Sequence, residues 1–306
     1  MNVVIKVTNT TKEKMIKYYE NKKRDKVIPY VIFQADEEDT VITMYESGKI
    51  MFQGTSADVD ANMWKAMDGQ SATPELEKKE KEAKEGKYHN CSSVGSDEVG
   101  TGDYFGPVVV SSAYVRKEDV AYLEELGIRD SKKLTDDKIL KMAPQIVKRI
   151  KYRSIILSNS EYNEKYGTNT NMNKIKAIMH NKMLYQIMEE EKPEIDYIIV
   201  DEFAKENKYY DYIKDSAYIQ RGITFMTKAE DKNLAVACAS IISRYIFIKE
   251  FDKLSDSLHI PLQKGAGAGV DIIGKEVVEK YGEDKLKEVA KLNFLNTQRI
   301  LGTLII

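Results

Sequence analysis

The amino-terminal part of the chain combines short alternating hydrophobic runs with one amphipathic stretch. Residues 3–7 alternate as a β-strand does, and Asn9, Thr10 and Thr11 then offer N-caps for a helix that reaches about Lys22. Turn residues separate three further predicted strands, at residues 30–34, 40–45 and 49–53. A short helix is expected around residues 63–67. These elements predict a small α+β domain.

The rest of the chain alternates between hydrophobic runs of strand length and amphipathic stretches of helix length. Five strands are predicted, at residues 92–97, 107–115, 152–157, 195–200 and 223–226. Helices are predicted at residues 117–126, 136–150, 160–191 and 234–251. We expect the first three strands to form an antiparallel meander and the later ones to be parallel, because helices connect them. The pattern predicts an α/β fold with a mixed five-stranded sheet and flanking helices.

A highly charged segment separates the two patterns. Ten of the thirteen residues from Glu75 to Lys87 are charged, and several acid–lysine pairs are spaced i,i+4. Such pairs favour a solvated helix or a stiff linker and not a core element. We therefore expect an amino-terminal domain at residues 1–72, a charged linker at 73–88 and a larger domain at 89–306.

Composition excludes some classes of protein. The 306 residues carry 47 Lys and Arg against 49 Asp and Glu, a net charge of -2, and 42% are hydrophobic. This near balance argues against a globally basic DNA coat protein and an acidic disordered chain, although a local basic face remains possible. The longest uncharged run, residues 104–115, is too short to span a membrane, and the start lacks the apolar core of a signal peptide. We expect a cytoplasmic protein without membrane contact.

Cysteine and histidine are scarce. The chain has two cysteines, Cys91 and Cys238, and three histidines, which give neither a disulfide framework nor a zinc site with CxxC spacing. Carboxylates would therefore have to hold any bound metal. Carboxylate oxygens favour Mg²⁺ or Mn²⁺.

Pairs of adjacent acids follow three of the predicted strands. They are Asp97-Glu98, Asp201-Glu202 and Glu230-Asp231. The carboxyl ends of parallel strands meet at one crevice of an α/β sheet, so these acids can converge there. Clustered carboxylates repel one another unless cations neutralise them, and two divalent ions that promote displacement at phosphorus would do so. Any single pair, taken alone, is more typical of an exposed turn, and the prediction rests on the three pairs together.

The first helix and its turn are basic. This segment contains eight basic residues and only three acidic ones. The basic residues are Lys6, Lys12, Lys14, Lys17, Lys22, Lys23, Arg24 and Lys26, and the acidic ones are Glu13, Glu20 and Asp25. Such a patch can meet a phosphate backbone. The alternative, an ordinary soluble helix surface, stays open. The same holds for Lys176 and His180 on a predicted helix, which can face a substrate or only solvent.

Several blocks of the sequence resemble one enzyme family. Residues 95–107, Gly-Ser-Asp-Glu-Val-Gly-Thr-Gly-Asp-Tyr-Phe-Gly-Pro, resemble the signature of the type 2 ribonucleases H in their HIII form, which has Gly-Thr-Gly where the HII form has Gly-Arg-Gly. Residues 129–134 and 227–231 are similar to further blocks of the family. Residues 30–34 and 48–54 resemble its amino-terminal substrate-binding domain, which is similar to half of a TATA-box-binding protein. The resemblance thus implies that residues 1–72 bind substrate and that residues 89–306 form the catalytic domain. The resemblance covers nearly the whole chain and implies a ribonuclease H-like fold.

The resemblance also implies roles for particular residues. The metal-holding carboxylates of the family correspond to Asp97, Glu98, Asp201 and Glu230. Its substrate-binding positions correspond to Gly100, Thr101 and Gly102, whose backbone would contact RNA 2′-hydroxyls, and to Ser131 and Lys132, which would bind phosphate. A glycine-rich segment at residues 263–270 departs from the family pattern, which weakens any phosphate-binding role for it.

The implied function is that of a monomeric endonuclease. It would hydrolyse the RNA strand of RNA–DNA hybrids with two Mg²⁺ or Mn²⁺ ions and leave 5′-phosphate and 3′-hydroxyl ends. One alternative is another nuclease with clustered acids, such as a junction resolvase or an exonuclease. The other is a non-catalytic protein that binds hybrids through its amino-terminal domain.

Overall fold

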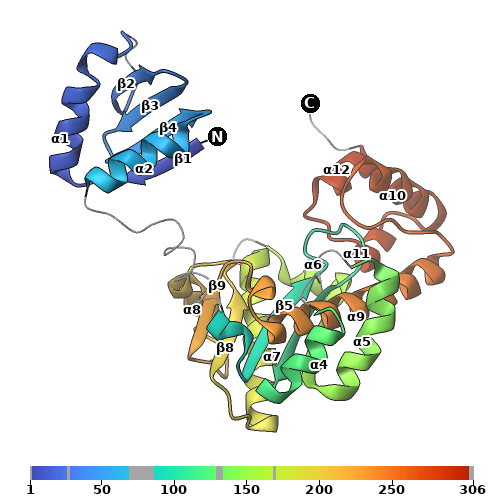
Figure 1. Cartoon of the computed structure of the whole chain (residues 1–306). Coiled ribbons are helices and arrows are strands. Elements are labelled where there is room, and N and C mark those ends of the chain that lie inside the picture. The colour runs from blue at the N-terminus through green and yellow to red at the C-terminus, as the bar shows by residue number, and fades with distance from the viewer. Residues whose placement is uncertain (1, 26–27, 69–85, 129–133, 168–169, 303–306) are drawn as a thin grey trace. The chain divides into compact units, whose positions relative to one another are not determined.

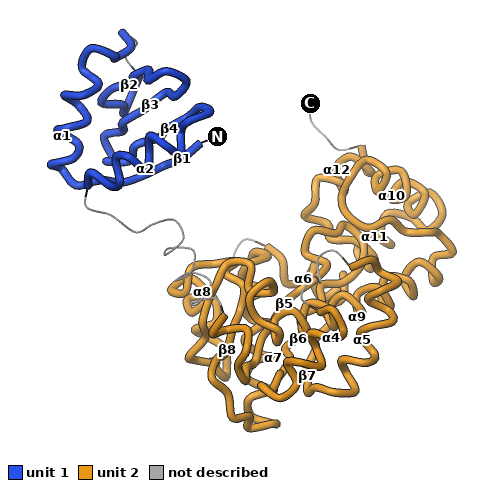
Figure 2. The backbone as a smooth tube through the Cα atoms, viewed as in Figure 1, with its two compact units in different colours: residues 1–82 blue, residues 83–306 orange. Residues whose placement is uncertain are grey.

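The computed structural model describes residues 2–25, 28–68, 86–128, 134–167 and 170–302. The chain forms two compact units, residues 1–82 and 83–306 (Figure 2). Most of the charged linker expected at residues 73–88 lies outside the described residues, so its boundaries stay a prediction. No helix in the described part of the chain is long and apolar enough to cross a membrane.

The first unit is a four-stranded antiparallel sheet with two helices (Figure 1). Its elements, in chain order, are β1 (Asn2–Lys6), α1 (Asn9–Tyr18), β2 (Val31–Glu37), β3 (Thr40–Tyr45), β4 (Lys49–Gly54) and α2 (Ala57–Met67). The strand order across the sheet is β1-β4-β3-β2. The Thr8 side chain caps α1, so the cap lies one residue before the predicted positions. The helix ends at Tyr18, and a 3₁₀ turn (Glu20–Lys22) replaces the last predicted turn.

Both helices of this unit pack on one face of the sheet. Met15 of α1 and Trp64 of α2 join one buried cluster with sheet residues such as Ile42 and Phe52. The Trp64 indole N–H donates a hydrogen bond of 2.8 Å to the Tyr19 hydroxyl in this core. A buried indole needs such a partner, and here the bond ties α2 to the end of α1.

The second unit contains the predicted mixed five-stranded sheet. Its strands are β5 (Ser93–Val99), β6 (Val108–Val115), β7 (Lys151–Leu157), β8 (Tyr197–Asp201) and β9 (Ile223–Met226). The order across the sheet is β7-β6-β5-β8-β9. Strands β5, β6 and β7 form the antiparallel meander, and β5, β8 and β9 are parallel, as the sequence predicted.

Helices cover both faces of this sheet, whereas the last three described helices pack chiefly against one another and the end of the preceding long helix. They are α4 (Val120–Glu125), α5 (Asp136–Arg149), α6 (Asn159–Lys165), α7 (Met172–Glu191), α8 (Glu206–Ile213), α9 (Leu234–Leu258), α10 (Ala268–Tyr281), α11 (Lys285–Val289) and α12 (Leu295–Leu301). The helical region predicted at residues 160–191 consists of two helices, α6 and α7. The sequence pattern did not predict α8 or the carboxy-terminal helices α10 to α12.

The alternation of side chains along β6 shows which helix covers which face. Ala113 and Val115 pack in a cluster with α9 and α5, whereas Val108 and Val110 pack with α7 on the opposite face. Helix α9 lies very close to β5, because a Cβ on Gly95 would approach the Val236 nitrogen to 2.3 Å. Helices α7 and α9 thus lie on opposite sides of β5, the strand that carries the first acidic pair.

Candidate active site

The predicted acids lie at one edge of the second sheet. Asp97 and Glu98 stand near the carboxyl end of β5, and Asp201 is the last residue of β8. Glu230 lies in the 3₁₀ turn Ala229–Asp231 that follows β9. The Asp201 carboxylate accepts a hydrogen bond of 3.0 Å from the Ala229 nitrogen, which joins the last two positions. The parallel order of the strands explains this convergence.

The two adjacent acids of β5 interact with different helices. Successive side chains of a strand point to opposite faces. Asp97 is hydrogen-bonded by Ser240 of α9, whereas Glu98 contacts Lys176 and His180 of α7. Among the described residues, no three His, Cys, Asp or Glu side chains form a ready-made metal site. The structure brings the four acids to one edge without closing them around a common point.

The pKa of Asp97 is raised well above the usual range of an aspartate. The residue is half-buried, and its main-chain oxygen accepts a hydrogen bond of 3.1 Å from the Ser243 hydroxyl. Burial, then the charge of Glu98, and more weakly that of Asp201 raise the pKa of Asp97. The negative charge at this position is therefore unfavourable unless a cation or a proton compensates for it.

The negative charge of Glu98 is compensated by two side chains of the protein itself, Lys176 and His180. The Lys176 ammonium contacts one carboxylate oxygen, and the His180 Nε2 atom lies 2.8 Å from the other. Burial by itself raises the pKa of Glu98, but the hydrogen bond and charge of His180, together with Lys176, outweigh burial and lower it. Glu98 is thus held as a carboxylate.

His180 is fully buried and tied to the sheet. Its Nδ1 atom lies 2.6 Å from the Ser96 hydroxyl, which also donates to the main-chain oxygen of Ser111 at 3.0 Å. The sequence left open whether Lys176 and His180 face substrate or solvent, and the structure shows that both face Glu98. A usable signal was present, since a lysine and a histidine at i,i+4 interrupt an otherwise apolar helix face.

The Gly-Thr-Gly loop follows directly after β5. Gly100 is buried with a φ of +89°, and a Cβ there would lie 2.1 Å from the Pro107 oxygen. The fold itself therefore requires this glycine. Gly102 is exposed, and a Cβ on it would meet nothing within 4 Å. Of the two glycines, only Gly102 leaves an open backbone face for another molecule.

A buried lysine fixes the end of this loop. The Lys291 ammonium donates to the main-chain oxygens of Asp103, at 2.8 Å, and Gly106, and its backbone nitrogen donates to Tyr104. Its side chain has no exposed surface, and burial lowers the pKa of Lys291 to about 7. The sequence did not single out Lys291, because nothing in its local pattern distinguishes it from a surface lysine.

The predicted phosphate-binding residues Ser131 and Lys132 lie outside the described residues. The chain that follows them is fixed by Asp136, which accepts hydrogen bonds from Arg244 of α9 and from Lys264. Arg244 also donates to the main-chain oxygen of Leu134 at 2.8 Å. The glycine-rich segment therefore contacts the start of α5 through Lys264.

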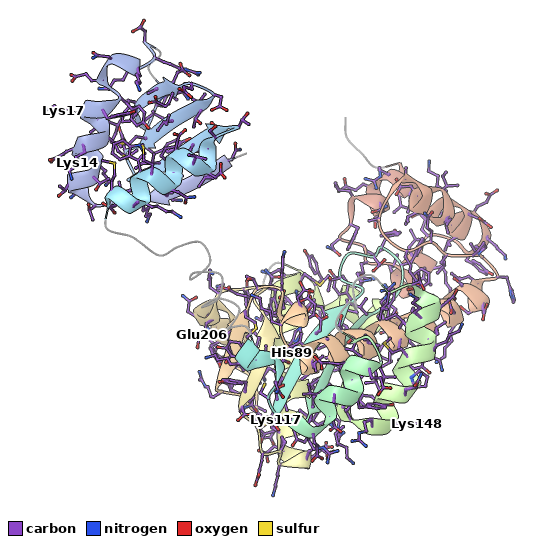
Figure 3. All side chains as sticks on the ribbon, in the orientation of Figure 1. Lys14, Lys17, His89, Lys117, Lys148 and Glu206 are labelled. Atoms are coloured by element: carbon purple, nitrogen blue, oxygen red, sulfur yellow. The ribbon has the colours of Figure 1, made fainter. Side chains whose placement is uncertain are left out.

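The predicted basic patch of the first unit is partly neutralised. Lys22 is paired with Glu37 at 2.6 Å, and Arg24 with Asp36. Lys14 and Lys17 are exposed on α1 (Figure 3). The patch that remains for a partner is narrower than the sequence suggested.

The donor set at the edge of the sheet fits a hard divalent cation. All four predicted ligands are carboxylates, the preferred ligands of Mg²⁺ and Mn²⁺. The raised pKa of Asp97 beside two other acids shows that positive charge is favoured there. Their role as metal ligands stays a prediction.

Comparisons with known proteins agree with this architecture. The family model of Ribonuclease HII matches residues 94–297, and that of a domain of unknown function, DUF3378, matches residues 2–78. The chain is 38% identical over 310 residues to a Ribonuclease HIII of Bacillus cereus, with 99% of both chains covered. It is similarly 38% identical over 306 residues to a Ribonuclease HIII of Bacillus mycoides, with 97% of both covered.

Solved structures show the same similarity. The crystal structure of Bst-RNase HIII in complex with Mn²⁺ matches with a TM-score of 0.71 and 35% identity, and 99% of each chain is covered. The ribonuclease H2 from Pyrococcus horikoshii matches with a TM-score of 0.58 and 21% identity, over 69% of this chain and 98% of that one. The second match supports the fold alone.

Proposed function

The chain belongs to the ribonuclease HII family, in its ribonuclease HIII branch, and is an endoribonuclease; on this premise we propose that it hydrolyses the RNA strand of RNA–DNA hybrids. The observation that carries the proposal is the acidic edge of the sheet beside an open Gly102. Asp97, Glu98 and Asp201 lie at the ends of two parallel strands, and the Gly-Thr-Gly loop begins one residue after β5. A relative crystallised with Mn²⁺ supports a divalent ion as the cofactor.

Asp97, Glu98, Asp201 and Glu230 would hold two Mg²⁺ or Mn²⁺ ions. When bound, the ions supply charge neutralisation at the phosphate and favour in-line displacement by water. Hydrolysis in this sense leaves 5′-phosphate and 3′-hydroxyl ends. The protein contributes by holding its carboxylates rigidly, Asp97 through Ser240 and Asp201 through the Ala229 nitrogen.

The Gly-Thr-Gly loop would recognise RNA. The 2′-hydroxyl distinguishes the backbone of RNA from that of DNA, and it both donates and accepts hydrogen bonds. The exposed backbone of Gly102 can approach a sugar closely because it lacks a Cβ, and Thr101 adds a hydroxyl. Lys291 keeps the far end of the loop in place through Asp103 and Gly106.

Two other regions would bind the rest of the hybrid. Ser131 and Lys132 would bind a phosphate of the substrate. The amino-terminal unit would bind the duplex, with Lys14 and Lys17 of α1 neutralising backbone phosphates. We propose that one chain is sufficient for all these contacts.

A gel assay on matched duplexes tests the proposal. End-labelled RNA–DNA hybrid, DNA duplex and RNA duplex of one sequence are incubated with the enzyme in Mg²⁺ and in Mn²⁺. We expect cleavage of only the RNA strand of the hybrid, and far better cleavage of a run of ribonucleotides than of a single one embedded in DNA. Cleavage of DNA junctions or DNA ends would indicate another nuclease, and binding without cleavage would indicate a non-catalytic protein.

A further inference from the structure

We propose that Lys176 is a built-in countercation of the acidic site, which neutralises Glu98 and competes with divalent ions for it. The inference deepens the proposed function, because it takes Glu98 to be part of the metal site. Lys176 would then be a positioning residue that tunes metal affinity and would not take part in the reaction itself.

The surroundings of Lys176 single it out from the other lysines of α7. Only 9% of its surface is exposed, and its ammonium contacts Glu98 while also lying 4.1 Å from the centre of the Phe203 ring. A buried ammonium is costly unless it is compensated, and here both Glu98 and the ring of Phe203 compensate it. The ring offers the ammonium an attractive position that does not depend on Glu98.

The other oxygen of Glu98 is held independently of Lys176. His180, one helical turn further along α7, lies 2.8 Å from it and is anchored by Ser96 and by stacking on Phe203 at 5.3 Å. A carboxylate has about four lone-pair sites, so Glu98 can keep His180 and still offer an oxygen to a metal ion. Lys176 is therefore the contact that an incoming cation would weaken or replace.

The charge of Lys176 has two consequences of opposite sign. Without a divalent ion, the ammonium relieves repulsion among Glu98, Asp97 and Asp201, and so it stabilises the fold. With a divalent ion nearby, the same ammonium repels that ion and lowers its affinity. A lysine with a merely structural role would stabilise the protein without weakening metal binding.

Direct measurement of Mn²⁺ binding tests this role without using activity. Free Mn²⁺ is quantified by electron paramagnetic resonance during titration of the full-length protein and of Lys176→Met, with thermal melting in EDTA alongside. We expect Lys176→Met to bind Mn²⁺ about tenfold more tightly than the wild type and to melt at a lower temperature in EDTA. Adding Mn²⁺ should raise the melting temperature of Lys176→Met by more than it raises that of the wild type.

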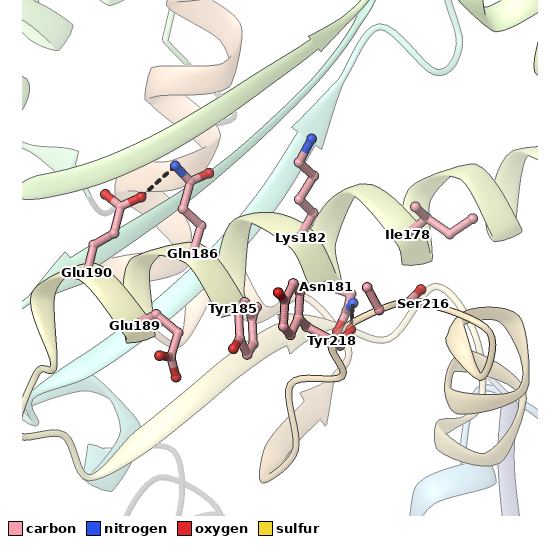
Figure 4. Close-up of a pocket in the computed structure, with 10 residues that line it drawn as sticks. Ile178, Asn181, Lys182, Tyr185, Gln186, Glu189, Glu190, Ser216 and Tyr218 are labelled. Carbon is pink, nitrogen blue, oxygen red and sulfur yellow. Dashed lines mark hydrogen bonds between the residues drawn. The ribbon is translucent and has the colours of Figure 1, made fainter.

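Lys182→Met is the matched control. Lys182 lies on the same helix but is exposed, and it lines a hollow of about 530 Å³ formed with Tyr185 and Tyr218 (Figure 4). This change removes the same charge from α7 without touching Glu98, so we expect wild-type Mn²⁺ affinity. Lys176→Arg keeps the charge and should also stay within about twofold of the wild type. If Lys176→Met does not fold, Lys176→Gln provides a neutral side chain that can still hydrogen-bond to Glu98.

Unchanged or weaker Mn²⁺ binding by the neutral variants would overturn the proposal, as would equal tightening by Lys182→Met. The two hypotheses fail separately. If the wild type binds Mn²⁺ but leaves the hybrid intact, the proposed function fails. If the wild type cleaves the hybrid and the neutral variants bind Mn²⁺ no more tightly, only the role of Lys176 fails.

Discussion

At the scale of single residues, the two glycines of the Gly-Thr-Gly loop differ in what surrounds them. A Cβ at Gly100 would overlap with the Pro107 oxygen, whereas a Cβ at Gly102 would project into open space. A change at Gly100 therefore disturbs folding, and a change at Gly102 leaves the fold intact. A substitution at Gly102 can therefore test a contact to substrate without also disturbing the fold.

We expect Gly102→Ala to melt within about two degrees of the wild type and to lose at least tenfold in cleavage of the hybrid. The added methyl group would keep the loop backbone away from the sugar. Thr101→Ala should lose less, and Gly100→Ala should melt at a clearly lower temperature. Full activity of a folded Gly102→Ala enzyme would eliminate the proposed backbone contact.

The lowered pKa of Lys291 predicts how the stability of the protein depends on pH. The pKa of this lysine is about 7 in the folded protein against the ordinary 10.5, so between these values the unfolded chain binds more protons than the folded one. Stability from this group therefore rises as the pH increases above 7, by up to about 1.4 kcal/mol per pH unit. Lys291→Met removes this contribution.

Urea unfolding at pH 7, 8 and 9 measures the effect. The free energy of unfolding of the wild type should rise with pH relative to that of Lys291→Met. Parallel pH profiles of the two proteins would mean that Lys291 is charged in the fold at all these values.

At the scale of elements, the strand pattern and the acids at strand ends could be predicted because both follow from local periodicity. Strand β9 and the mixed sheet were predicted correctly. The position of the break between α6 and α7 and the helices α10 to α12 were not predicted. For the break, local signals were present, since the side chains of Ser158 and Asn171 cap the starts of α6 and α7. The opposite orientations of Asp97 and Glu98 follow from the pleat of β5, but the partners on α7 and α9 required the fold.

That difference in partners predicts opposite effects on stability. Asp97→Asn removes a charge that its neighbours repel, so the free energy of unfolding should stay the same or rise. Glu98→Gln leaves Lys176 and His180 without their carboxylate, and breaking a buried ion pair costs about 3 kcal/mol. Urea unfolding in EDTA compares the two variants. Equal destabilisation by both would contradict the separate environments of the two acids.

At the scale of the whole molecule, the sequence left open whether the basic surface of the amino-terminal unit binds nucleic acid or is an ordinary helix surface. The extent of that surface could not be read from the sequence, because Lys22 and Arg24 are paired with acids of β2. Lys14 and Lys17 remain as the exposed cations of α1 that we expect to matter most.

Replacing both Lys14 and Lys17 by Gln should weaken hybrid binding and make its dependence on salt shallower. Each lost phosphate contact lowers the slope of log K against log salt by about 0.9. Lys117→Gln with Lys148→Gln is the matched control, because both residues are exposed at the opposite edge of the catalytic sheet from Asp97. Equal effects of the two double changes would mean that α1 makes no specific contribution.

The central claim is that the acidic edge of the sheet performs the cleavage of RNA in a hybrid. Asp201→Asn tests it most directly, because this side chain ends β8 and also accepts the hydrogen bond from Ala229. We measure initial cleavage rates and binding of one labelled hybrid in Mg²⁺ for the wild type and this variant, and we map the product ends. The account predicts 5′-phosphate and 3′-hydroxyl ends for the wild type, and hybrid binding without turnover for the variant. Cleavage by Asp201→Asn at a rate near that of the wild type would contradict it.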